Sequence, residues 1–276
     1  MKIGVTLRLM GDSATRATLE ACAQHAERVG FDGLWLPDHI AIPPDDAEGS
    51  NGRYLDILAS LAWLAGRTER IALGAGVLVL PYRPTLPTAK WLATIQALSG
   101  DRLQLGVGVG WMDAEFRALG IERRHRGRDS DALLEFLHAC FDAEDDVVES
   151  NGQPFLFRPH PKRPPFLIGG APPHAIERTV RFGDGWLPMS SDPGQLAAPI
   201  RELRERFQGA GKGTPEVVVM GAIPTGSPAE GVDLIGALQE IGVTGFIHGT
   251  RYATFDEFAA RVEPASAMLD TLGRGT

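Results

Sequence analysis

The chain has 276 residues, of which 43% are hydrophobic and 22% are charged, and its formal net charge is −8. This composition argues against a disordered chain, and the acidic surface argues against nucleic acid or anionic membranes as partners, since both need a basic patch. No apolar run approaches the ~20 residues of a membrane helix and the first residues lack a secretory pattern, so the sequence predicts a soluble, cytoplasmic protein.

Eight short apolar runs alternate with stretches of helical period along the chain. The runs cover residues 3–9, 33–39, 71–81, 102–110, 165–170, 185–188, 217–224 and 244–248. Their mean spacing of about 34 residues suits one strand, one helix and two loops per unit. Apolar stripes typical of amphipathic helices lie over residues 19–29, 57–65 and 133–141.

Strand–helix alternation predicts a parallel sheet covered by helices, and eight units favour a closed (β/α)8 barrel of the TIM type. We therefore expect one α/β domain over residues 1–276, with a doubly wound open sheet as the alternative. Residues 144–164 depart from this rhythm because they are polar and contain prolines. They predict an inserted hairpin or loop before the fifth strand, which either overhangs the barrel mouth or forms inert surface.

Active sites of such barrels lie at the carboxyl ends of the strands, and this rule selects few side chains. Asp38 and His39 follow the second run, Trp111 follows the fourth, and His248 is a secondary candidate after the eighth. A free imidazole titrates at about pH 6.5, so His39 suits general acid–base catalysis; a structural histidine is the alternative. Asp38 either orients His39 or caps the next element. Trp111 either flanks a bound ring or fills the rim.

Glycines leave one face of the third and fourth runs nearly bare. Because successive side chains point to opposite faces of a strand, Gly74 and Gly76 share one face, as do Gly106 and Gly108. Glycine inside a strand often marks the close approach of a ligand or of another part of the protein. The pattern predicts either a slot for a flat ring or tight packing against a bulky side chain from elsewhere in the barrel.

A second glycine motif, Gly169-Gly170-Ala171, leads from the fifth run into a helical stretch that begins near Pro173. Backbone amides of such a turn and the N-terminus of a helix both favour an anion, so the motif is typical of a phosphate cradle. It is equally typical of an ordinary connection between a strand and a helix.

Other polar clusters are less informative. A basic run either meets an anionic ligand or lies in solvent; it consists of Arg123, Arg124, Arg126 and Arg128. Cys22 and Cys140 lie far apart on helical patterns and predict neither a disulfide framework nor a zinc site. We expect no metal.

Six segments together resemble the luciferase-like oxidoreductases, the flavin- and deazaflavin-dependent branch of barrel enzymes. They are FDGLWLPDH (31–39), LGAGVLVLP (73–81), LGVGVGW (105–111), RGR (126–128), PFLIGG (165–170) and GDGW (183–186), in the order of the family. Each segment alone is weak evidence for the family, but the six segments in this order are specific to it. It covers roughly residues 1–190, and the remainder matches only as completion of the barrel.

The resemblance implies that coenzyme F420 or FMN lies in the barrel mouth, with His39 beside the reactive ring. It also implies a bulge with a non-proline cis peptide at Gly76–Val77 and a phosphate site at residues 169–171. With His39 as the catalytic residue, the expected cofactor-binding residues are Asp38, Gly74, Gly76, Val77, Gly108, Trp111, Gly169, Gly170 and Ala171.

Two departures limit this transfer. The F420-dependent sugar-phosphate dehydrogenases of the family carry a Glu about where Trp111 stands and a Trp near Pro43, and both are absent here. We therefore expect hydride transfer between F420 and a small organic substrate of another kind. The first alternative is an FMN-dependent monooxygenase that uses O2 and takes reduced flavin from a separate reductase. The second alternative is a non-catalytic barrel that only binds the cofactor. The sequence leaves the oligomeric state open between a monomer and the homodimer that relatives often form.

Overall fold

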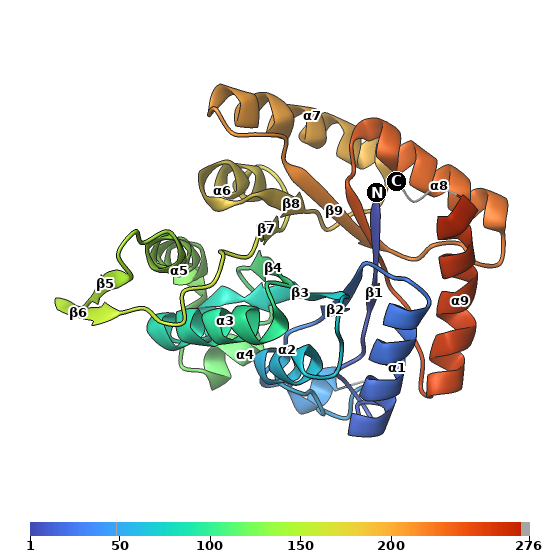
Figure 1. Cartoon of the computed structure of the whole chain (residues 1–276), viewed down its shortest axis with the longest axis horizontal. Coiled ribbons are helices and arrows are strands. Elements are labelled where there is room, and N and C mark those ends of the chain that lie inside the picture. Colours follow the sequence, from blue (N-terminus) through green and yellow to red (C-terminus); the bar gives the residue numbers. More distant parts are fainter. Residues whose placement is uncertain (48, 272–276) are drawn as a thin grey trace.

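Eight parallel strands close into a barrel with helices around its outside (Figure 1). The structure is a computed structural model that describes residues 1–47 and 49–271, with side chains up to residue 268. Around the barrel the strands pair in the order β1 (Lys2–Thr6), β10 (Gly245–His248), β9 (Glu216–Gly221), β8 (Gly185–Leu187), β7 (Phe166–Gly169), β4 (Leu103–Gly108), β3 (Ala72–Val79) and β2 (Gly33–Leu36). Because β1 pairs with both β10 and β2, the sheet has no edge. The predicted (β/α)8 barrel is confirmed, and the open-sheet alternative is wrong.

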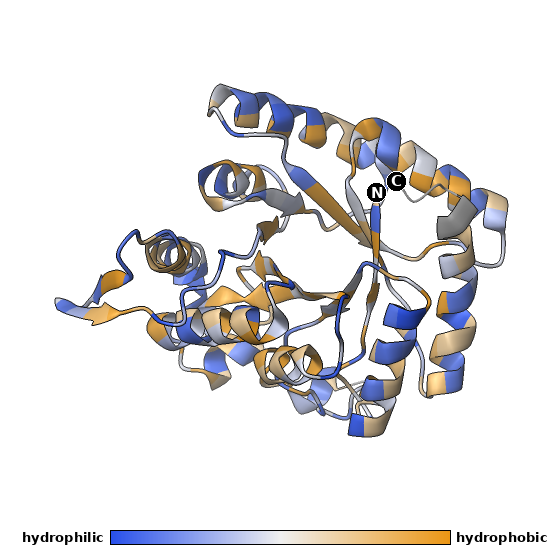
Figure 2. Ribbon diagram, in the orientation of Figure 1, coloured by the Kyte–Doolittle hydropathy of each residue, from blue (hydrophilic) through white to orange (hydrophobic). Residues whose placement is uncertain are grey.

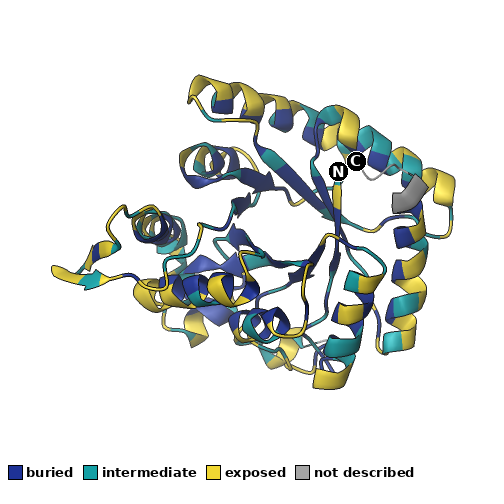
Figure 3. Cartoon of the chain, in the orientation of Figure 1, coloured by how far each residue is buried: buried dark blue, intermediate teal, exposed yellow. Residues whose placement is uncertain are grey.

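The three predicted amphipathic stripes form helices, and further helices follow the other strands. They are α1 (Arg16–Arg28), α2 (Ile57–Ala65), α3 (Thr85–Ser99), α4 (Asp113–Ala118), α5 (Arg126–Phe141), α6 (His174–Phe182), α7 (Pro193–Gly209), α8 (Pro228–Ile241) and α9 (Phe255–Thr271), with short 3-10 turns η1 (Pro44–Asp46), η2 (Leu80–Tyr82) and η3 (Arg123–His125). The strands are hydrophobic and buried, whereas the outer faces of the helices are hydrophilic and exposed (Figures 2 and 3). The main core therefore lies between the barrel and its helices.

A single indole dominates the interior of the barrel. Trp35 of β2 packs in a buried cluster with Leu167, Leu187, Val218 and Ile247. A side chain at Gly4 or Gly74 would clash with the ring of Trp35. The bare face of β3 therefore makes room for the protein's own indole at Gly74. At Gly74 the glycine therefore allows tight packing against a bulky side chain, as one of the two alternatives predicted. The predicted slot for a flat ring is wrong at this position, because Trp35 already fills the space.

We expect Gly74→Ala to lower the free energy of unfolding by about 1–3 kcal/mol, because the added methyl group meets the indole in a packed interior. Gly213→Ala is the matched control, since a Cβ at Gly213 would meet no atom within 4 Å. Urea unfolding of both variants checks this. Equal stability of the two variants would show that Trp35 can move aside.

The inserted segment contains an antiparallel hairpin of β5 (Val147–Ser150) and β6 (Gln153–Leu156). It projects away from the barrel beside α5 (Figure 1). Gln96 of α3 donates to the carbonyl of Lys162 (3.0 Å) and accepts from the amide of Leu103 at the start of β4 (2.9 Å). The segment is thereby held at the amino-terminal end of the strands. The predicted hairpin is confirmed, and the idea that it overhangs the carboxyl-end mouth is wrong.

Two further sequence predictions concern membranes and thiols. Among residues 1–47 and 49–271, no helix has the length and apolar character needed to cross a bilayer. Cys22 and Cys140 are buried free thiols, and burial raises the pKa of each to about 12. Both thiols are therefore protonated at neutral pH. Within the same described part of the chain, no group of three His, Cys, Asp or Glu side chains is placed to hold a metal ion.

Candidate functional site

The barrel is open above the Trp35 cluster, at the carboxyl ends of the strands. Residues that face the interior at this level, among them Gly76, Val77, Gly108 and Met220, are partly exposed, whereas the cluster below them is buried. The register of β3 shifts between Ala75 and Leu78, and the peptide bond Gly76–Val77 is cis. The predicted bulge and cis peptide are therefore confirmed at the floor of this mouth.

The side chain of Val77 forms the centre of the floor. A Cβ at Gly108 would lie 2.6 Å from its Cγ2, and a Cβ at Gly169 would lie 3.0 Å from its Cγ1. Glycine at these two positions lets Val77 pack directly against the strands β4 and β7. The floor is apolar and low, because no side chain from Gly76, Gly108 or Gly169 rises above it.

His39 lies just after β2, and its imidazole Nδ1 is 3.0 Å from Oε2 of Glu115 in α4. The carboxylate is almost completely buried, with 1% of the side chain exposed, whereas 19% of the His39 side chain is exposed. This hydrogen bond joins residues 76 positions apart in the chain. It fixes the imidazole at the rim of the barrel mouth.

Glu115 is held by three further hydrogen bonds. Its Oε1 accepts from the backbone amides of Ile40 (2.6 Å) and Ala41 (3.0 Å), and its Oε2 accepts from the hydroxyl of Tyr82 (3.0 Å). Burial alone would raise the pKa of Glu115, but the amides of Ala41 and Ile40, together with His39, outweigh it and leave the pKa lowered. The carboxylate is therefore ionised at neutral pH and can only accept hydrogen bonds.

An acceptor-only carboxylate determines the tautomer of His39. Nδ1 must carry a proton and donate it to Glu115, so Nε2 of the neutral ring presents a lone pair. Nε2 makes no hydrogen bond to any residue in 1–47 or 49–271. His39 is thus oriented with Nδ1 bonded to Glu115 and Nε2 available to a ligand.

Two aromatic residues flank His39. The ring of Tyr54 lies 4.9 Å from the imidazole, centroid to centroid, and Trp111 lies 6.4 Å away, edge-on at 88°. Trp111 follows β4, and it is 65% exposed although it is large and apolar. Burial, with Glu115 nearby, raises the pKa of Tyr54, so its hydroxyl is protonated at neutral pH. These rings form one wall of the mouth.

Asp38 has a structural role that neither sequence interpretation anticipated. Its carboxylate accepts from the amide of Val79 (2.9 Å) and from both terminal nitrogens of Arg83 (2.6 and 2.8 Å). Arg83 also donates to Asp56, the N-cap of α2 (3.0 Å). Asp38 therefore neither orients His39 nor caps a helix. Its expected place at the cofactor is corrected, because both carboxylate oxygens are engaged within the protein.

The predicted phosphate cradle is only partly available. The amide of Gly170 donates to the carbonyl of Leu187 (3.2 Å), and the carbonyl of Gly170 accepts from Trp186 Nε1 (2.9 Å). Helix α6 begins at His174, as the sequence predicts. An anion at this corner would meet the amide of Ala171 and the N-terminus of α6 rather than Gly170. The phosphate site stays a prediction.

The basic run lies in and beside η3, and three of its four arginines are paired with neighbouring acids. Arg123 pairs with Asp113 (3.1 Å), Arg124 with Glu122 (3.3 Å) and Arg128 with Asp129 (2.9 Å). Arg126 instead donates to the carbonyl of Arg123 (3.2 Å). The solvated interpretation describes the run well, because three of its four charges already have an acidic partner.

The secondary candidate His248 faces away from the mouth. It is 3% exposed, and its Nδ1 accepts from the amide of Ile223 (3.1 Å). Since Ile247 points into the barrel, His248 points outward into the main core. It belongs to the packing between barrel and helices.

The sequence analysis did not identify Glu115. The family's glutamate is absent at Trp111, but a carboxylate reaches His39 from a position four residues further along the chain. The available signal was a glutamate beside Phe116, on the apolar side of a short helix. An acidic side chain there needs buried partners.

Comparisons with known proteins show the family and the fold of the chain. The family model described as luciferase-like monooxygenase matches residues 3–230. An uncharacterised protein of Mycobacterium tuberculosis is 30% identical over 278 residues, which is 91% of this chain and 94% of that protein. The structure of an F420-dependent secondary alcohol dehydrogenase with an F420–acetone adduct has a TM-score of 0.81 at 14% identity and covers 99% of both chains.

A second structure is a type II Baeyer–Villiger monooxygenase of Pseudomonas putida in complex with FMN. It has a TM-score of 0.75 at 15% identity and covers 98% of this chain and 96% of its own. At these identities the two structures show that the fold is shared.

Proposed function

Because the chain belongs to the luciferase-like monooxygenase family, we propose that it is an oxidoreductase that holds coenzyme F420 in the barrel mouth and exchanges hydride with a small organic substrate. The observation that supports this most directly is the pair of His39 and Glu115 at the rim of the mouth. A histidine with a fixed tautomer and one free nitrogen suits a reaction in which a proton moves together with a hydride.

The residues of the mouth fit a planar heterocycle. Gly76 and Gly108 keep the floor low, because Met220 and Val77 pack where a Cβ at these positions would lie. The exposed ring of Trp111 offers an apolar wall. The amide of Ala171, with the N-terminus of α6, would hold a phosphate. When bound, the deazaflavin supplies the ring carbon that accepts or gives up hydride, while the protein supplies orientation and exclusion of water.

The protein's own residues handle the proton. Nε2 of His39 takes a proton from a substrate hydroxyl in oxidation and returns it in reduction. Glu115 keeps Nδ1 protonated and stabilises the imidazolium that forms. Tyr82 and the amides of Ile40 and Ala41 hold the carboxylate in place. This arrangement supports an enzyme over a non-catalytic barrel, because it leaves Nε2 of His39 without a partner among the described residues and available to a substrate.

An FMN-dependent monooxygenase supplied by a separate flavin reductase is the second candidate. One observation favours it. Arg123, Arg124 and Arg128 near η3 are already paired with acids, so they offer little unbalanced charge to the anionic tail of F420.

We expect F420 to quench the tryptophan fluorescence of the protein, and we expect Trp111→Phe to remove most of that quenching, because Trp111 is the exposed indole beside His39. Trp91→Phe is the control, since Trp91 is 45% exposed but lies in α3, on the outside of the barrel. Titration with F420 and FMN separates the two candidates. Binding of neither cofactor at about 50 µM would refute the proposal in both forms.

A further inference from the structure

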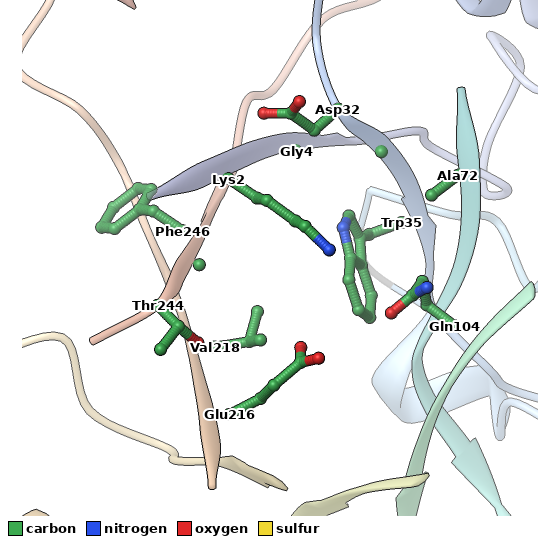
Figure 4. A pocket seen from close by; sticks show the side chains of 12 residues that line it. Lys2, Gly4, Asp32, Trp35, Ala72, Gln104, Glu216, Val218, Thr244 and Phe246 are labelled. Atoms are coloured by element: carbon green, nitrogen blue, oxygen red, sulfur yellow. The ribbon is translucent and has the colours of Figure 1, made fainter. Parts of the chain in front are cut away.

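A separate cavity lies at the opposite end of the barrel, at the amino-terminal ends of the strands. Its volume is about 300 Å³, at the lower end of the range for small-molecule pockets. In most such barrels bulky branched side chains fill the interior layers. Here Gly33, Ala72 and Gly245 contribute almost no side-chain volume to this layer. Figure 4 shows the resulting hollow with Trp35 as one wall.

Two hydrogen-bond donors meet on one side of this cavity. Lys2 of β1 points toward the indole of Trp35 (Figure 4). Neither the ammonium group of Lys2 nor the Nε1–H group of Trp35 donates a hydrogen bond to any residue that the structure describes. Trp35 is 6% exposed as a residue, and its Nε1–H group faces the cavity beside Lys2 (Figure 4). The two groups together suit an anionic group such as a carboxylate.

An unpaired carboxylate lines another part of the same cavity. Glu216 at the start of β9 points into it (Figure 4). Its side chain forms no hydrogen bond or ion pair with any residue in 1–47 or 49–271. In particular, it does not pair with Lys2. The other carboxylate of the lining, Asp32, already accepts from the amide of Ile3 (2.7 Å). Opposite charges that share a cavity without pairing suit a ligand that carries both charges.

We propose that this cavity binds a small α-amino acid in its zwitterionic form, with an apolar side chain. Its carboxylate accepts from Lys2 and from Trp35 Nε1, and its ammonium group donates to Glu216. The remaining wall is apolar at Ala72 and Val218, where the side chain of the ligand packs. This site is independent of the mouth, because it lies below the Trp35 cluster and uses none of the residues around His39.

Isothermal titration of the cofactor-free protein with L-leucine tests the assignment. We expect a Kd on the order of 1 mM or lower. Two analogues each lack one charge: 3-methylbutylamine has no carboxylate and 4-methylpentanoate has no ammonium group. Each is expected to bind at least about tenfold more weakly, since a hydrogen bond between charged groups is lost.

Variants complete the test. Lys2→Met and Glu216→Gln are expected to weaken L-leucine binding at least about tenfold, and Ala72→Met to abolish it by filling the cavity. Lys162→Met and Glu149→Gln, at exposed positions, are the matched controls. Absence of binding at about 20 mM, equal affinity of the three ligands, or unchanged affinity in Lys2→Met and Glu216→Gln would overturn the proposal. If Glu216→Gln fails to fold, the analogues and Lys2→Met decide it.

Discussion

Replacing Glu115 with glutamine lowers kcat/KM by about 10²–10⁴ while the fold is retained, because the variant presents the wrong tautomer of His39. The amide oxygen of glutamine takes the place of Oε1, which accepts from Ile40 and Ala41. The NH2 group then faces Nδ1 of His39, which can only accept from it. The proton of the neutral ring therefore moves to Nε2, and the lone pair is lost from the side that meets the substrate.

Three measurements check this expectation. Steady-state kinetics with F420 gives the loss in kcat/KM. The 15N chemical shifts of the imidazole report the tautomer of His39 in the absence of cofactor or substrate. Asp113→Asn, at an exposed position in the same helix, is the control and retains activity. An unchanged tautomer in Glu115→Gln, or near-normal kcat/KM, would mean that Glu115 does not act as a positioning residue for His39.

Arg83→Met is expected to lower the free energy of unfolding by about 3–5 kcal/mol, because it leaves the buried carboxylate of Asp38 without its cation. The side chain of Asp38 is 0% exposed and that of Arg83 is 5% exposed, so water cannot replace the lost partner. The pair connects the end of β2 with the turn η2 after β3, next to His39. The loss is therefore expected to loosen the rim of the mouth as well.

Urea unfolding measures the effect. Arg70→Met is the control, because Arg70 is 72% exposed and a surface change of this kind shifts stability by only about 0.5 kcal/mol. The double variant Asp38→Asn with Arg83→Met is expected to recover part of the loss, since it removes the unpaired charge. A loss below about 1 kcal/mol in Arg83→Met would show that Asp38 is solvated or protonated without its partner.

The features of this protein that could be predicted are those that depend on the pattern of neighbouring residues along the chain. Apolar runs and helical stripes predicted all eight barrel strands and placed α1, α2 and α5, because each side chain reports locally which face is buried. The number of strand–helix units then favoured a closed barrel, and the rule for the carboxyl ends directed attention to His39. The resemblance to the family predicted the cis peptide at Gly76–Val77, which local propensity alone does not.

The partners of the same residues could not be predicted in this way. The alternation of residues along β3 showed that Gly74 leaves one face of the strand without a side chain. It could not show that Trp35 fills this space, since the two residues lie on different strands. The segment before β7 was predicted as an inserted hairpin or loop, whereas its position followed from contacts with α3. In each case the deciding contact joins distant parts of the chain.

The amino-acid sequence by itself determined the barrel, its open carboxyl-end rim and the presence of a histidine there. Only the tertiary structure decided that Glu115, rather than Asp38, holds that histidine and that Asp38 instead pairs with Arg83. The physical reason is that a carboxylate chooses its partner by distance and burial in the folded state, and neither quantity is encoded in the spacing of residues along the chain.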